Sequence, residues 1–277
     1  MIRLSYISLT AALTLATNAA EPARIIFQNG KSIPITAVTL QGDKLVVTAD
    51  IDGFKEKDAL PLQFADYVFG EKPAEINQAI ASMLMDRLQA AQAQSILEPI
   101  VAQHQATAKI PGNFWIEAAK ALLLSFALSG DATACNAIGK EISDATPTQG
   151  VDPFVALGKA LLVNPLAKLE EREAALRGQT TDNLPAEVCA YASYFRGILL
   201  AKEKQDAKAL EAFLMVTCIY PSGGMIINSA AEIQAADLMS AASKHEEALK
   251  LATSALRSSI GTKLLEDEAN KRLESLK

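Results

Sequence analysis

The chain has 277 residues, of which 50% are hydrophobic and only 5% aromatic, and its formal net charge is −6 at pH 7. Acidic and basic residues are interspersed, with no basic stripe of the kind that binds phosphate backbones, so nucleic acid is not an expected partner. The length allows two domains, and the many small residues suit closely packed helices.

The first 20 residues have the pattern of a secretory signal peptide. A cationic start at residues 1–3 precedes an apolar run at residues 11–16 and small residues before the expected cut, after Ala19 or Ala20. The run is shorter than the about 20 apolar residues of a spanning helix, and no Cys lies near the cut to carry a lipid anchor. We therefore expect an exported protein, periplasmic or secreted. The alternative, a buried first helix or strand, is opposed by the polar residues and the proline that follow.

Residues 21–72 are predicted to form a small antiparallel β module. Asn29-Gly30 and Gly42-Asp43 supply the positive backbone angles of hairpin turns. Apolar side chains alternate with a period of two around these turns, at Ile25 and Phe27, Ile33 and Ile35, and Leu45 and Val47. The pattern is similar to SH3-like or Sm-like small barrels. So short a segment buries only a marginal core, and we expect the sheet to pack against the first helices through Phe64, Tyr67 and Phe69.

From residue 73 to residue 277 the apolar period is that of helices. The sharpest motif there is Gly197, Ala209, Phe213 and Pro221, whose spacings of 12, 4 and 8 resemble the tetratricopeptide repeat. In that family small residues let two antiparallel helices approach closely, the aromatic residue fills the space between hairpins, and the proline stops the second helix. The resemblance, especially to members of the bacterial periplasm and envelope, implies helices over 185–202 and 206–220.

Looser versions of the repeat extend this pattern along the chain, with a turn expected at Gly130-Asp131 and a final amphipathic capping helix near the C-terminus. The fold class expected is therefore mainly α, with the β module followed by a tetratricopeptide-like solenoid of helical hairpins over residues 73–277.

The register of the repeat that contains Gly197 and Phe213 implies a ligand surface. With Gly197 at the small-residue site of the family, the residues that face the concave surface would be Tyr191, Tyr194, Ile198 and Lys202. Tyrosine suits recognition because it offers apolar area and a hydroxyl at little entropic cost. The alternative is that both tyrosines pack between neighbouring hairpins.

The same register brings Cys189, early in the first helix, near Cys218, late in the second. Because an oxidising compartment pairs thiols that lie close, a Cys189–Cys218 disulfide is predicted, with Cys135 buried and free. The alternative is that all three are buried small apolar residues.

Residues that carry chemistry are few. The two histidines, His104 and His245, and three cysteines show no metal-ligand spacing, and there is no phosphate loop or nucleophile elbow. No catalytic residue, metal or cofactor is therefore expected. Three hypotheses follow: a non-catalytic adaptor or scaffold that binds a protein or peptide partner in the cell envelope, an accessory or structural subunit of an envelope complex, and, least favoured, a hydrolase of a periplasmic polymer.

Overall fold

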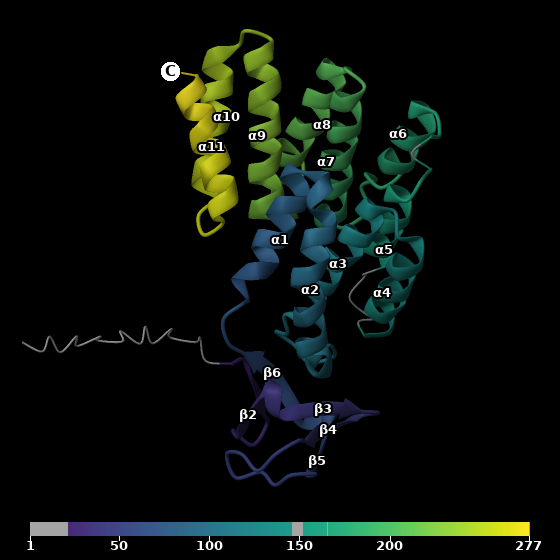
Figure 1. The fold of residues 1–277 in the computed structure, drawn as a ribbon, viewed down its shortest axis with the longest axis vertical. Helices are drawn as coiled ribbons and strands as arrows, with labels where there is room; N and C mark the ends of the chain where they lie inside the picture. The colour runs from purple at the N-terminus through teal and green to yellow at the C-terminus, as the bar shows by residue number, and fades with distance from the viewer. Residues whose placement is uncertain (1–21, 146–151, 165, 277) are drawn as a thin grey trace, which may run out of the picture.

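A computed structural model describes residues 22–145, 152–164 and 166–276. The predicted signal peptide, residues 1–20, lies outside this range. The described residues are mainly helical, with a small β module at the N-terminal end, as predicted from the change of period near residue 73 (Figure 1). No helix among them is both long and apolar enough to cross a bilayer.

The β module consists of two antiparallel sheets of three strands, in the orders β2-β1-β6 and β3-β4-β5. Gly30 and Gly42 have φ angles of 78° and 63° in the two predicted hairpin turns, a conformation that glycine adopts without steric cost. The strands are β1 (Arg24–Phe27), β2 (Ser32–Pro34), β3 (Val38–Gln41), β4 (Lys44–Val47), β5 (Ala59–Pro61) and β6 (Ala65–Phe69).

The module meets the helices through other residues than those predicted. Phe64, Tyr67 and Phe69 are 49%, 43% and 65% exposed. The pleat of β6 turns Val68 inward and its neighbours Tyr67 and Phe69 outward, and Phe64 lies in the turn before the strand. The Val68 amide donates to the carbonyl of Pro111, at 2.9 Å, in the loop that follows the second helix. The buried core of the module extends into the same connection, at Ala106 and Ile110.

The helices follow one another as packed neighbours along the chain (Figure 1). One exception shapes the molecule: α1 also contacts α3, α9 and α11, so the first helix lies among helices from the far end of the sequence. The bounds are α1 (Ala74–Met85), α2 (Ala90–His104), α3 (Trp115–Ser129), α4 (Ala132–Ala145), α5 (Asp152–Leu161), α6 (Leu169–Arg177), α7 (Ala186–Lys202), α8 (Asp206–Cys218), α9 (Met225–Ala241), α10 (His245–Ser258) and α11 (Lys263–Ser275).

The α7–α8 hairpin shows why the motif has its spacing. Ala209 and Phe213 are almost fully buried, and a Cβ placed on Gly197 would lie 2.6 Å from the Phe213 ring. Only a residue without a side chain fits there, so the two helices approach at the glycine. The helix ends agree with the predicted ranges to within two residues, and the chain after α8 turns at Pro221.

The predicted turn at Gly130-Asp131 is also present. Gly130 ends α3 with a φ of 84°, and the Asp131 carboxylate accepts the amide of Ala134 at 2.9 Å in the first turn of α4. A left-handed glycine followed by an aspartate cap satisfies backbone groups at both helix ends.

Candidate binding site

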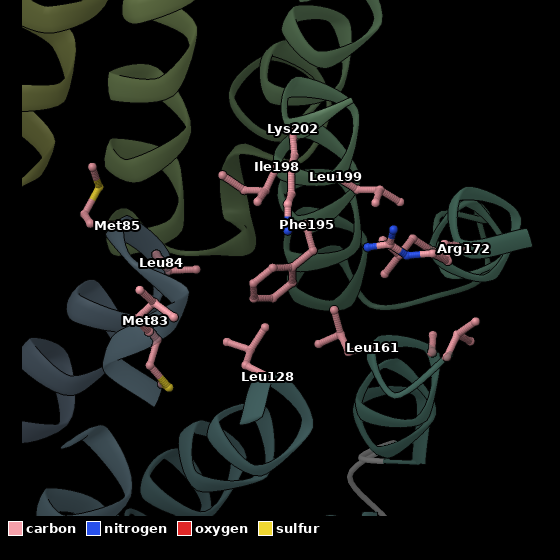
Figure 2. Close-up of a pocket in the computed structure, with 14 residues that line it drawn as sticks. Met83, Leu84, Met85, Leu128, Leu161, Arg172, Phe195, Ile198, Leu199 and Lys202 are labelled. Carbon is pink, nitrogen blue, oxygen red and sulfur yellow. The ribbon is translucent and has the colours of Figure 1, made fainter. Parts of the chain in front are cut away.

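A cavity of about 400 Å³ opens between α1, α5, α6 and α7. Of the fourteen described residues that line it, twelve are apolar and two are cations, Arg172 and Lys202; Figure 2 shows them. The apolar lining consists of Met83, Leu84, Met85, Leu88, Leu128, Ala160, Leu161, Val163, Leu176, Phe195, Ile198 and Leu199. Leu88, at the lip, is 87% exposed. An apolar cavity of this size with a few charged groups is typical of ligand sites.

Helix lengths account for the opening. α7 has 17 residues, whereas α5 and α6 have 10 and 9. At 1.5 Å per residue α7 is therefore about 10 Å longer than either helix beside it. α5 ends at Leu161 and α6 begins at Leu169, so part of the α7 face is left uncovered beside them.

One wall is held in place by Tyr194. Its hydroxyl donates a hydrogen bond of 2.5 Å to the carbonyl of Leu84, in the last turn of α1. Carbonyls in the last turn have no partner within their own helix, and this bond supplies one inside the core. Since Leu84 and its two neighbours line the cavity, Tyr194 supports that wall without lining the cavity itself.

The two cations differ in their surroundings. Arg172 faces Glu203 at 3.8 Å, and its side chain is 19% exposed. Lys202 is exposed and forms no ion pair with any residue that the structure describes. In Figure 2 the Lys202 side chain runs along α7 toward Phe195, and Arg172 extends from α6 toward α7. No carboxylate lies among the lining residues, so the cavity favours a negative charge near these two groups.

The four residues predicted to face a partner divide into two pairs. Ile198 and Lys202 line the cavity. Tyr194 is fully buried and Tyr191 is 7% exposed, so these two side chains do not form an open recognition surface. The repeat register did not include the helices that cover them: Tyr194 reaches Leu84 of α1, and Tyr191 packs against Phe154 of α5.

Aromatic packing surrounds both tyrosines. Tyr191 meets Phe154 edge to face, with ring centroids 5.7 Å apart, and Tyr194 lies 5.6 Å from Phe213. Burial raises the pKa of both tyrosine hydroxyls well above the ordinary value, so both stay neutral at physiological pH. They act as packing residues between hairpins, which was the alternative interpretation.

A second cavity, of about 440 Å³, lies beside the start of α9 and is lined in part by Tyr191. Its cations already have partners: Lys72 pairs with Glu117 at 2.9 Å, and Lys120 pairs with Glu187 at 2.6 Å. Because these charges are compensated within the protein, this cavity offers a ligand less unpaired charge than the first.

The predicted disulfide is not formed in the structure, where Cys135, Cys189 and Cys218 are all free. Cys189 is buried, with its thiol directed at the carbonyl of Thr181, 3.8 Å away. Cys218 is exposed and lies near Thr217 on α8. The two helix ends are neighbours as expected, but the thiols point to different surroundings.

Groups suited to catalysis are scarce in the described part of the chain. It contains no cluster of three or more His, Cys, Asp or Glu side chains able to hold a metal. His104 is 3% exposed, and its ring packs edge to face with the ring of Phe114, with the two centroids 5.8 Å apart. Its Nδ1 is buried without a hydrogen-bond partner among the described residues, and burial lowers its pKa.

Arg172 and the α1 residues of the cavity were not identified from the sequence. Arg172 lies in a charged segment that reads as a solvated helix face, and Met83 to Met85 read as one more apolar stripe. Sequence periodicity does not indicate that α6 and the end of α1 line one cavity together with α7. In comparisons with protein-family models, curated proteins and solved structures, none matches this chain.

Proposed function

We propose that this protein is a non-catalytic exported adaptor that holds a protein or peptide partner in the cell envelope through the helical surface around the first cavity. The observation that carries the proposal is the cavity itself, an apolar opening lined by a lysine that has no ion-pair partner among the described residues. Exposed apolar area next to unpaired charge is favourable to bury against a partner with an apolar anchor and an acidic group.

The hairpin geometry also supports the resemblance to tetratricopeptide repeats. The close approach of α7 and α8 at Gly197, where a Cβ would collide with Phe213, is the feature that the family's small-residue positions imply. Export rests on the N-terminal pattern of the sequence alone.

A second candidate is an accessory subunit of an envelope complex, docked through the β module. It is favoured by one observation, the three exposed aromatic side chains Phe64, Tyr67 and Phe69 on and beside β6. Exposed aromatic clusters of this kind are enriched at protein interfaces.

Site-specific photocrosslinking in cells of the source organism tests both candidates. A photoreactive phenylalanine replaces Leu88 at the lip of the cavity, or Phe69 on the β module. The matched control is Ile219, which directly follows α8, is 62% exposed and does not line the cavity. A discrete protein adduct from position 88 that weakens in a Lys202→Glu background supports the adaptor. An adduct from position 69 alone favours the accessory subunit, and equal adducts from all three positions would refute a specific surface.

A further inference from the structure

The lining of the first cavity indicates the chemistry of what enters it. Its described side chains are hydrocarbon or thioether, apart from the two cations, and none carries a neutral hydrogen-bonding group. A ligand inside therefore gains from burying apolar surface and finds no side-chain hydroxyl or amide for a polar body. This favours a hydrocarbon body over one with many polar groups.

The two cations that line the cavity indicate the charge at one end of such a ligand. Lys202 has no ion-pair partner among the described residues, and Arg172 has only the single contact with Glu203 at 3.8 Å. Both cations line the cavity; Figure 2 shows the Lys202 side chain directed toward Phe195 and the Arg172 guanidinium directed from α6 toward α7. An anionic head group complements this end of the cavity.

The volume of the cavity limits the length of the alkyl chain that it can hold. Taking the roughly 30 Å³ that one water molecule occupies in the liquid as the size of a methylene-like unit, a cavity of about 400 Å³ holds about a dozen such units. Met83 and Met85 contribute flexible side chains to the α1 wall, and methionine adapts readily to irregular apolar ligands.

We propose that this cavity binds the alkyl chain of an anionic single-chain amphiphile, with the head group beside Lys202 and Arg172. The inference rests on the proposed function in one respect, namely that the cavity is a binding site. It does not require a protein partner, so amphiphile binding without photocrosslinked protein would leave this inference standing and refute the adaptor.

Calorimetric titration of the purified protein tests whether the cavity binds an alkyl chain. The ligands are octanoate, decanoate and dodecanoate, each below its micellar concentration. We expect saturable 1:1 binding that tightens about fourfold for each added methylene, which corresponds to the transfer of one buried methylene from water. Equal affinity for the three carboxylates, or no saturation with any of them, would overturn the proposal.

Decanol tests the head group. Decanoate is expected to bind about threefold to fivefold more tightly than decanol, the scale of a partly exposed ion pair. Lys202→Glu should abolish this preference, whereas Lys208→Glu, an exposed lysine on α8 that does not line the cavity, should keep it. Equal binding of decanol and decanoate to the unmodified protein would refute the anionic end.

Two variants test the location. Ile198→Trp fills the cavity from α7 and should weaken dodecanoate binding at least tenfold, while Ile219→Trp, directly after the end of α8, should not. Leu88→Asp provides a second variant at an exposed position that does not threaten the fold, and it should also weaken dodecanoate by adding a negative charge at the lip. Unchanged affinity in Leu88→Asp and in a folded Ile198→Trp protein would place the ligand elsewhere and refute the assignment.

Discussion

Replacing Gly197 by alanine should destabilise the protein, although alanine favours helices. The added Cβ would lie 2.6 to 2.8 Å from three atoms of the Phe213 ring, and Phe213 is itself 1% exposed, with little room to move. Forcing extra volume into a packed core costs about 1–3 kcal/mol, here toward the upper end, and the better helix propensity of alanine returns about 1 kcal/mol. We expect a net loss of about 2 kcal/mol.

Urea unfolding followed by circular dichroism measures this loss, and a second substitution tests its cause. In a Phe213→Leu background, the smaller side chain leaves space, so Gly197→Ala should cost at least about 1 kcal/mol less than in the unmodified protein. Gly178→Ala is the matched control, because a Cβ there has no neighbour closer than 3.4 Å. If Gly197→Ala is no less stable than the unmodified protein, or costs the same in both backgrounds, the steric explanation fails.

Three further predictions concern a buried tyrosine, a buried histidine and the three cysteines. Tyr194→Phe should lower the free energy of unfolding by about 1–2 kcal/mol, since it leaves the Leu84 carbonyl buried without its partner; an unchanged urea midpoint would contradict that bond. Burial lowers the pKa of His104 in the folded state, so below the ordinary value of about 6.5 the unfolded chain takes up the proton more readily. The free energy of unfolding should therefore be unaffected by His104 above that pH and decrease below it. Urea unfolding at pH 7.5 and 5.5 measures this slope, which should shrink in His104→Gln. Finally, native alkylation should label Cys218 but not the two buried cysteines, and denaturation without reductant should expose all three; a mass showing only one labelled thiol after denaturation would restore the predicted disulfide.

Local patterns in the sequence determined much of the fold. The change of apolar period near residue 73 separates the β module from the helices, because side chains alternate along a strand and recur every 3.6 residues along a helix. Turns at Gly30, Gly42 and Gly130 were predictable since each needs a positive φ that glycine adopts freely. The close approach of α7 and α8 at Gly197 was implied by the tetratricopeptide resemblance, whereas the packing of Phe213 on that glycine within the hairpin was not.

The candidate site was decided by contacts between distant segments. The register implied by the tetratricopeptide resemblance placed Ile198 and Lys202 on the open face of α7, but it placed Tyr194 there too. The Tyr194 hydroxyl instead reaches Leu84, 110 positions earlier in the chain, because α1 packs among later helices. A pattern within one helix specifies which side chains share a face, whereas what covers that face depends on where every other helix ends and packs.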